Sequence, residues 1–431
     1  LGAAGGLCLA APMAVGLTLL AIAVVTLVLL VGLKACAGYA ALGAPPPRAL
    51  PTAGAILPTV SLFVALYRES DIAARLVGRL ARLDYPPDLL DVILAVEAED
   101  IITREALARA ELPAWMRVVI VPAGQVKTKP RALNHALDYC RGAIVGVYDA
   151  EDAPEADQIR KVVTRFHNSG PDVACLQGML DYYNPRTNWL SRCFTIEYAT
   201  WFRLILPGIA RLGLAVPLGG TTLFFRRSVL VELGGWDAHN VTEDADLGIR
   251  LARHGYRTDL IDTVTDEEAN CRPVHWVKQR SRWIKGYMMT WAVHMREPRV
   301  LWRQLGSWRF FGFQVMFLGT IAQFLLAPLL WTFVLIGLGL GHPMQDVLDG
   351  WALIGLIGLF AASELLNLSL GILALRKTAH RLNPLWVITM KLYFPLASLA
   401  AFKALAELAT KPFYWDKTSH GIFDAVEQRK R

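Results

Sequence analysis

Hydrophobic residues form long uninterrupted runs at both ends of the chain, and the first run begins at the N-terminus. There is no charged residue from Leu1 to Leu33, and Leu9–Leu33 is long enough, at about 1.5 Å per residue, to cross a hydrocarbon core about 30 Å thick. Positive charge follows at Lys34 and Arg48, whereas a cleavable signal peptide carries it first. The pattern predicts a membrane-spanning helix. Because the sequence opens without Met inside apolar sequence, it is consistent with a fragment in which an earlier helix precedes this one.

A second set of apolar runs lies in the C-terminal part. No Asp, Glu, Lys or Arg occurs between Arg309 and Asp346, and two further runs cover Trp351–Leu375 and Leu382–Phe402. We expect two or three more membrane helices, and arginines before the first of them indicate that it is entered from the cytoplasm.

Two charged residues, Glu364 and Lys391, interrupt these C-terminal runs. An ionisable residue in a membrane helix is a candidate functional residue, but these two can equally pair with each other or extend toward the interface. The sequence leaves these alternatives open.

The middle of the chain, from Arg48 to Arg309, has ordinary charge density and alternates β-rich runs with helical patterns. The predicted strands are Thr59–Leu66, Asp91–Val96, Arg117–Val121 and Ala143–Tyr148, and the predicted helices are Ile72–Leu83, Thr103–Ala110, Arg131–Cys140 and Glu155–Asn168. Such alternation predicts an α/β domain with a doubly wound, mostly parallel sheet.

Composition supports a membrane protein, since 54% of the residues are hydrophobic and 19% are charged. The net charge of +7 suits anionic lipids or a phosphorylated substrate, and a basic-aromatic groove pattern typical of nucleic-acid binding is absent from the sequence. The six cysteines form no C-x-x-C pair, which argues against a structural zinc site and a disulfide framework.

Acidic residues follow two of the predicted strands, where ligands bind in parallel sheets. They are Glu97 after the second strand and Asp149, Glu151 and Asp152 after the fourth. The sequence has neither a G-x-G-x-x-G fingerprint nor a phosphate-binding loop, so a nucleotide would need another way to hold its phosphates. Paired carboxylates can do so through a divalent metal.

Three motifs, in this order, resemble those of family-2 glycosyltransferases, specifically the membrane-embedded branch with cellulose, hyaluronan and chitin synthases. Val147-Tyr148-Asp149-Ala150-Glu151-Asp152 is similar to its D-x-D, Thr242-Glu243-Asp244 to its T-E-D, and Gln279-Arg280-Ser281-Arg282-Trp283 to its Q-x-x-R-W. Lys129-Pro130-Arg131-Ala132-Leu133-Asn134 is similar to a further family segment, K-x-x-x-L-N.

The resemblance implies a GT-A-like fold and a role for each matched residue. Asp149 and Glu151 would bind Mg²⁺ or Mn²⁺, and Asp244, with Glu243 beside it, would be the catalytic base. The residues implied in donor binding are Glu97, Asp100, Lys129, Asp149, Gln279 and Arg282, and those implied in acceptor binding are Thr242 and Trp283.

The sequence departs from the family pattern in two places. It reads Val96-Glu97-Ala98-Glu99-Asp100 where many relatives have an Asp pair, which leaves open which acid binds the nucleoside, and Glu151 stands where Asp is usual.

Simpler structural roles remain open for several motif residues. Asp149 and Glu151 can be solvated loop acids, and Thr242 can be a helix N-cap followed by first-turn acids. Trp276, Trp283 and Trp291 are spaced as in an amphipathic helix lying on a membrane with Lys278, Arg280 and Lys285.

The function expected first is inverting, metal-dependent transfer of a sugar, with uridine diphosphate glucose as the default donor, to a growing β-linked polysaccharide secreted through the enzyme's own helices. The alternative is transfer of one sugar to a polyprenyl phosphate. A transporter or receptor is a third class, which needs no base. Expected partners are the nucleotide sugar, the polysaccharide acceptor, membrane lipids, and periplasmic or accessory export proteins, without nucleic acid.

The expected location is the bacterial inner membrane, with several crossings and a cytoplasmic catalytic domain. The expected parts are residues 1–47 with one membrane helix, 48–309 with the catalytic domain and interfacial helices, 310–408 with the other membrane helices, and a C-terminal loop at 409–431. Its segment Lys411–Gly421 is either a gating loop over the donor or an interfacial aromatic belt. A cytoplasmic gating loop would require Leu382–Phe402 to be re-entrant or interfacial, with Pro395 as a candidate break.

Overall fold

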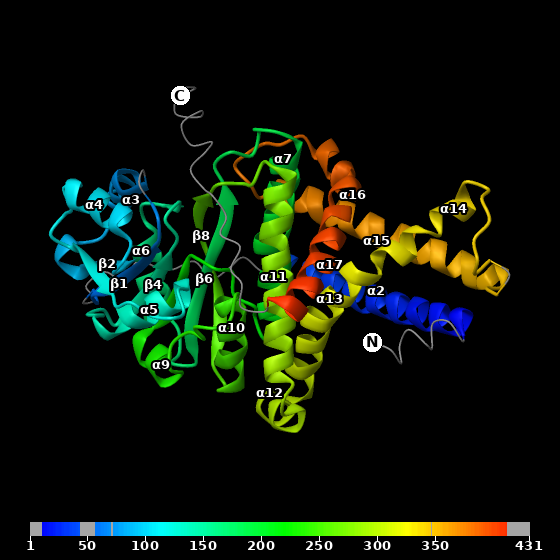
Figure 1. The fold of residues 1–431 in the computed structure, drawn as a ribbon, viewed down its shortest axis with the longest axis horizontal. Helices are drawn as coiled ribbons and strands as arrows, with labels where there is room; N and C mark the ends of the chain where they lie inside the picture. Colours follow the sequence, from blue (N-terminus) through cyan, green and yellow to red (C-terminus); the bar gives the residue numbers. More distant parts are fainter. Residues whose placement is uncertain (1–10, 44–56, 70–71, 346, 412–431) are drawn as a thin grey trace.

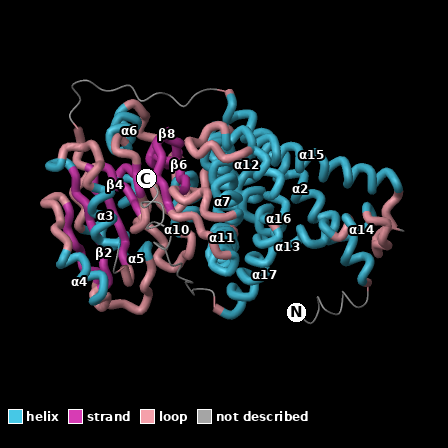
Figure 2. Tube along the Cα trace, turned by 90° about the horizontal axis from the view of Figure 1, so that it is seen from above, coloured by secondary structure: helices cyan, strands magenta, loops and turns pink. Residues whose placement is uncertain are grey.

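The structure, a computed structural model, describes residues 11–43, 57–69, 72–345 and 347–411. A twisted sheet and its helices occupy one half of the molecule, and the long apolar helices occupy the other (Figure 1). Helices α7 (Trp189–Thr200) and α11 (Pro273–His294) stand between the two halves, and the view from above shows the same division (Figure 2). The fold is thus an α/β domain joined to a helical bundle.

The sheet has eight strands in the order β3-β2-β1-β4-β7-β6-β8-β5. The strands are β1 (Val60–Leu66), β2 (Leu90–Glu97), β3 (Met116–Val121), β4 (Ile144–Tyr148), β5 (Ala153–Pro154), β6 (Val173–Tyr182), β7 (Leu223–Arg226) and β8 (Arg257–Glu267). Strands β1 to β4 pair in parallel, as predicted. The sheet becomes mixed beyond β4, because β7 runs antiparallel to both β4 and β6, and β5 runs antiparallel to β8.

Helices cover both faces of the sheet. They are α3 (Ile72–Leu80), α4 (Ile101–Arg109), α5 (Lys129–Asp138), α6 (Gln158–His167), α9 (Arg227–Glu232) and α10 (Glu243–Arg253), with a short turn of helix at Pro87–Leu89. Side chains alternate along β1, so Leu62 and Val64 enter the core formed with α3, α4 and α6, and Phe63 enters the core formed with α5, α9 and α10. The predicted helices are present, with ends that differ by a few residues.

Four stretches of helix are long and apolar enough to cross a membrane, and they coincide with the predicted runs. They are α2 (Pro12–Leu42), Pro298–Ile336, α15 (Gly350–Leu375) and Pro384–Thr410. The second stretch consists of α12 (Pro298–Phe313), a π-helical segment (Gln314–Gly319), α13 (Thr320–Trp331) and the start of α14 (Val334–Gly337). The fourth consists of a 3₁₀ turn (Pro384–Thr389), α16 (Met390–Tyr393) and α17 (Pro395–Thr410). The last stretch is interrupted between α16 and α17 at Pro395, the candidate break in the sequence.

Glu364 and Lys391, the charged residues that interrupt the C-terminal apolar runs, form an ion pair. The ammonium nitrogen of Lys391 on α16 lies 3.3 Å from a carboxylate oxygen of Glu364 on α15. This confirms pairing as one of the alternatives that the sequence left open.

The α/β domain and the membrane helices share one hydrophobic core. Ala37 on α2 and Ala374 on α15 belong to the same buried cluster as Phe63 of the sheet. Helix α2 runs so close to α8 (Leu206–Arg211) that a Cβ atom at Gly208 would lie 2.0 Å from the carbonyl oxygen of Ala37. Close approach through small residues is typical of helix pairs in membranes, so this contact fixes α2 against the domain.

The predicted C-terminal loop lies mostly outside the described residues, which end at Lys411. The gating and belt alternatives for Lys411–Gly421 therefore stay predictions.

We predict that Gly208→Val destabilises the protein by about 1–3 kcal/mol, because the new side chain overlaps the backbone of Ala37 and forces α2 away from α8. Thermal unfolding of the purified protein in detergent measures the effect. The matched control is Gly355→Val on α15, where nothing lies within 4 Å of the position. Equal midpoints for the two variants would contradict the prediction.

Candidate active site

A cavity of about 690 Å³ lies where the carboxyl ends of the strands face the membrane helices. Its outer part is lined by residues that follow β2 and β4 and by the first turn of α10, and α11 runs along it. Its inner part is walled by α2, α13, α15 and α16. One continuous space therefore connects the edge of the sheet to the interior of the helical bundle.

Most of the residues predicted for the site line this cavity. They are Glu97, Lys129, Asp149, Glu151, Thr242, Glu243, Asp244, Gln279, Arg282 and Trp283. Asp100 does not line it. Its carboxylate caps α4, accepting hydrogen bonds from the amide of Thr103 at 3.2 Å and from the amide of Arg68 at 2.5 Å. Asp100 therefore caps α4 outside the cavity, and among Glu97, Glu99 and Asp100 it is Glu97 that lines the cavity.

Glu97 and Asp149 each have a basic partner. Arg131 donates to both carboxylate oxygens of Glu97, at 3.0 and 3.1 Å. Lys129 forms an ion pair with Asp149 and also donates to the carbonyl oxygen of Gly220 at 2.8 Å. Burial acts to lower the pKa of Lys129, but Asp149 and Glu243 outweigh it and raise the pKa above its usual value. Lys129 therefore stays a cation at the centre of the acidic group.

Negative charge is concentrated beside Asp149. Asp152 is fully buried and accepts a hydrogen bond from the hydroxyl of Thr221, and burial, followed by Asp149 and Glu151, raises its pKa well above the usual value. Burial, followed by Asp152 and Glu151, likewise raises the pKa of Glu267. Carboxylate oxygens are the ligands that a hard divalent cation prefers, so the partly exposed Asp149 and Glu151 fit a metal at this position.

A second group of candidate metal ligands lies outside the cavity, where Asp181, Asp266 and His380 bring ligand atoms within 4.8 Å of one another. Asp181 already forms ion pairs with the buried guanidinium of Arg203 and with His380 at 2.8 Å. This group stands apart from the cavity that the predicted site residues line, and Asp181 and His380 already bind each other.

The T-E-D motif forms the start of α10. Thr242 occupies the N-cap position without a capping bond from its side chain, and the two acids stand in the first turn, as the structural alternative predicted. The Asp244 carboxylate accepts a hydrogen bond from the amide of Gly220. Burial raises the pKa of Asp244, and burial together with the neighbouring Asp244 raises the pKa of Glu243 to about 7. The motif thus combines a helix start with carboxylates that face the cavity.

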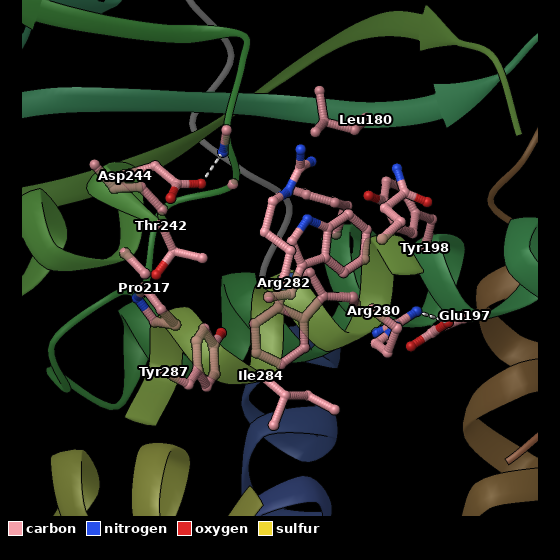
Figure 3. A pocket seen from close by; sticks show the side chains of 18 of the residues that line it. Leu180, Glu197, Tyr198, Pro217, Thr242, Asp244, Arg280, Arg282, Ile284 and Tyr287 are labelled. Carbon is pink, nitrogen blue, oxygen red and sulfur yellow. Dashed lines mark hydrogen bonds and ion pairs between the residues drawn. The ribbon is translucent and has the colours of Figure 1, made fainter. Parts of the chain in front are cut away.

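Helix α11 carries Gln279, Arg282 and Trp283 to the same cavity. Figure 3 shows Arg282 between Asp244 on one side and Tyr198 on the other. Burial lowers the pKa of Arg282, which remains a cation at neutral pH. Among the described residues the buried Oε1 atom of Gln279 has no hydrogen-bond partner.

Trp283 belongs to an aromatic cluster at the cavity wall. Its ring centre lies 6.1 Å from that of Phe194 and 6.3 Å from that of Tyr198. The Arg280 guanidinium lies 4.7 Å from the centre of the indole, which fits a cation–π contact. The cluster holds Trp283 in place while part of it faces the cavity.

The structure corrects the interpretation of α11 as an amphipathic helix on the membrane surface. Trp276 is 1% exposed, Arg280 pairs with Glu197 on α7 at 2.6 Å, and the buried Lys285 pairs with Glu407 on α17 at 3.2 Å. Because these basic side chains bind carboxylates of neighbouring helices, they do not face lipid headgroups.

The sequence did not point to several other residues of the cavity, among them Lys34, Glu197, Glu267 and Tyr287, nor to Gly286 on α11. Glu267 stands at the end of a strand, so the rule that selected Asp149 would also have found it. Gly286 had no such signal. A Cβ atom there would lie 2.3 Å from Thr242, so this glycine lets α11 pass directly over the T-E-D motif.

Comparison with known proteins matches residues 58–286, more than half of the chain, to the family described as glycosyltransferase like family 2. A beta-monoglucosyldiacylglycerol synthase of Synechocystis sp. is 31% identical over 253 residues, which cover 56% of this chain and 51% of the relative. The probable glycosyltransferase YdaM of Bacillus subtilis is 26% identical over 234 residues, covering 53% of this chain and 55% of the relative. The chain spans about half the length of these curated relatives.

Two further similarities concern a cellulose synthase and a solved structure. The cellulose synthase 1 catalytic subunit of Komagataeibacter xylinus is 26% identical over 290 residues, which cover 65% of this chain and 37% of the relative. The structure of the mannosyltransferase PcManGT from Pyrobaculum calidifontis, in complex with GDP-Man and Mn²⁺, aligns with a TM-score of 0.58 at 21% identity and covers 89% of this chain and 99% of that one. This likeness shows that the two chains share the GT-A-like fold.

We predict that Glu243→Gln makes stability less dependent on pH. A carboxyl whose pKa rises on folding from 4.5 to about 7 stabilises the protein below pH 4.5, and this contribution is lost as the pH rises through about 7. The difference in free energy of unfolding between the variant and the wild type should therefore shift in favour of the variant by about 1–3 kcal/mol from pH 5 to pH 8.

Thermal unfolding in detergent across this pH range measures the difference, and Glu105→Gln, an exposed acid on α4, is the control. If the two variants have parallel profiles, the burial of Glu243 does not perturb its titration.

Proposed function

Since the chain belongs to glycosyltransferase family 2, we propose that it transfers a sugar from a nucleotide sugar to a hydroxyl group of a membrane lipid. The observation that carries this proposal is the continuous cavity, which joins an acidic and basic end at the sheet to an apolar space between the membrane helices. A water-soluble donor and a lipid acceptor can meet in such a space.

The donor occupies the end of the cavity at the sheet. Lys129 and Arg282 supply positive charge for its diphosphate, and Arg282 offers a planar donor suited to phosphate oxygens. Asp149 and Glu151 hold Mg²⁺ or Mn²⁺, which supplies charge neutralisation of the diphosphate when bound. Glu97, the last residue of β2, lines the cavity and contacts the nucleoside in this proposal, and uridine diphosphate glucose is the donor that the family resemblance favours.

Asp244 is the catalytic base. Its carboxylate is held by the Gly220 amide, and its raised pKa makes it a better proton acceptor than a solvated Asp. The acceptor oxygen attacks the anomeric carbon as Asp244 takes its proton, and the bond to the diphosphate breaks on the opposite face. Direct displacement inverts the configuration, so an α-linked donor gives a β-linked product.

The acceptor reaches this base from the bilayer. The inner part of the cavity is lined by aliphatic and aromatic side chains, among them Leu30, Leu33, Phe324, Leu370, Val387 and Phe394. Such walls accommodate lipid chains, and the polar side chains Lys34, Asn367 and Glu364 line the same part. The glucosyldiacylglycerol synthase among the similar proteins agrees with a lipid acceptor.

A second candidate function is polysaccharide synthesis with export through the helices. It is favoured by the convergence of Gln279, Arg282 and Trp283 on the cavity, because Trp283 offers a flat surface for a terminal sugar, and by the similarity to a cellulose synthase subunit. Under either function we propose a multi-pass protein of the bacterial inner membrane, with residues 48–309 as the cytoplasmic catalytic domain between the membrane helices.

We predict that Asp244→Asn lowers the rate of sugar transfer about 10²–10⁴-fold, because the acceptor hydroxyl loses its base, while donor binding changes little. Transfer is measured with a labelled nucleotide sugar and purified protein in lipid nanodiscs, and donor binding is measured by calorimetry. Asp262→Asn, an exposed acid on β8, is the control. A fully active Asp244→Asn variant would contradict the role of Asp244 as catalytic base and would favour a transporter or receptor.

Product length separates the two candidate functions in the same assay. A lipid carrying one added sugar supports the proposed function, and a water-soluble ladder of increasing chain length supports polysaccharide synthesis.

We predict that a chelator abolishes transfer and that Mn²⁺ or Mg²⁺ restores it. Asp149→Asn should raise the metal concentration needed for half-maximal activity by about 10–100-fold, since one carboxylate ligand is lost. Asp84→Asn changes a solvent-exposed acid far from the cavity lining and should leave the metal requirement unchanged. Metal-independent activity of the wild type would contradict the assignment of Asp149 and Glu151.

A further inference from the structure

Lys34 is a basic residue on the inner wall of the cavity. It stands on α2, eight residues before the end of this helix at Leu42, which corresponds to about 12 Å along the helix axis. Its ammonium group donates a hydrogen bond to the amide oxygen of Asn367 on α15 at 3.3 Å. The surrounding walls are apolar, with Leu30, Leu33 and Leu370 also lining the space. Lys34 therefore places a positive charge inside a mostly apolar chamber.

The carboxylates near Lys34 already have other basic partners. Glu364 pairs with Lys391 at 3.3 Å, and Glu197 pairs with Arg280 at 2.6 Å. These two acids are the charges that act on Lys34. Within the described ranges no carboxylate lies within 4.0 Å of the Lys34 ammonium, whose one hydrogen-bond partner, Asn367, is neutral. Lys34 and these two ion pairs together carry three positive and two negative charges.

An excess cation in such surroundings is costly unless an anion joins it. Polar and ionisable groups in membrane helices are therefore candidates for ligand binding. The ligand has to share the chamber with the acceptor, because Lys34 and Asp244 line the same cavity. A phosphate ester is the anionic group that membrane lipids carry next to their acyl or prenyl chains.

We propose that Lys34, oriented by Asn367, binds the phosphate of the acceptor lipid. This inference rests on the proposed function. A phosphate oxygen is already ionised at pH 7 and needs no base, so the presence of Asp244 indicates that the nucleophile is a hydroxyl group. The acceptor class is therefore a lipid with a phosphodiester at Lys34 and a hydroxylated head group that extends to Asp244.

The transfer step leaves the lipid phosphate unchanged. The head-group oxygen forms a bond to the anomeric carbon and loses its proton to Asp244. The bond between the anomeric carbon and the diphosphate oxygen breaks, and its electron pair leaves with the nucleoside diphosphate. Lys34 acts on binding, so its removal should change the KM for the lipid more than kcat.

The test compares two acceptors in detergent micelles with a labelled nucleotide sugar. Phosphatidylglycerol has a phosphodiester and free hydroxyls, and diacylglycerol has a hydroxyl and no phosphate. We expect the wild type to use phosphatidylglycerol with the higher kcat/KM, and Lys34→Met to raise the KM for this lipid about tenfold or more, as expected for loss of a charge-assisted hydrogen bond. The KM for diacylglycerol and for the donor should stay within about twofold of the wild type, a difference well under 1.4 kcal/mol.

Two further variants make the result specific. Lys34→Arg keeps the charge and should retain most of the preference for phosphatidylglycerol. Lys161→Met removes a basic residue that is paired with Glu155 and does not line the cavity, and it should leave the preference unchanged. Thermal unfolding of each variant shows whether it is folded, and the wild-type preference between the two lipids keeps the proposal falsifiable if Lys34→Met is not.

The outcomes separate this inference from the proposed function. Equal use of both lipids, or an equal loss with both lipids in Lys34→Met, would overturn the role of Lys34 while lipid glycosylation stands. Sugar transfer to neither lipid, with a polymer as the product, would overturn the proposed function and the inference with it.

Discussion

Helix α11 is held between α7 and the membrane helix α17 by two ion pairs that are largely shielded from solvent, and the arrangement of the cavity depends on them. Arg280 binds Glu197 on α7, and Lys285 binds Glu407 on α17. Breaking such a shielded pair leaves a charge without its partner, which is unfavourable, so the two pairs limit how far the helix can shift. Gly286 lets the same helix pass over Thr242, and as a result Arg282 and Trp283 face the acids of the T-E-D motif across one space.

The charges in that space are unevenly distributed in a way that suits the proposed reaction. Carboxylates crowd the end at the sheet, where burial and mutual repulsion raise the pKa values of Asp152 and Glu243, and the cations Lys129 and Arg282 stand among them. A ligand that brings both a divalent cation and a diphosphate would neutralise both the carboxylates and the basic side chains. The opposite end of the cavity is apolar apart from a few side chains such as Lys34, so the two substrates of different polarity are kept at different ends.

Much of the fold and most of the candidate site could be predicted from the sequence. The first four strands follow from β-branched apolar runs, and the membrane helices follow from runs without charge. The order of the three motifs in the sequence was sufficient to predict that Asp149, Asp244 and Arg282 belong to one site. The antiparallel course of β7 was not predicted, because strand direction depends on pairing with strands distant in the sequence. The bond between the Asp100 carboxylate and the Arg68 amide was not predicted either, because the two residues are far apart in the sequence.

The sequence by itself determined which parts of the chain are apolar enough for a bilayer, which part folds as an α/β domain, and which residue types are available for metal, base and phosphate binding. Hydrophobic periodicity and residue chemistry are local properties, so they can be read along the chain. Tertiary structure decided which charges are neutralised and which face a ligand: Arg280 and Lys285 proved to be structural cations, and Lys34 proved to face the cavity beside a neutral amide. Electrostatic energy depends on distance and burial, and both are set by packing between segments far apart in the sequence.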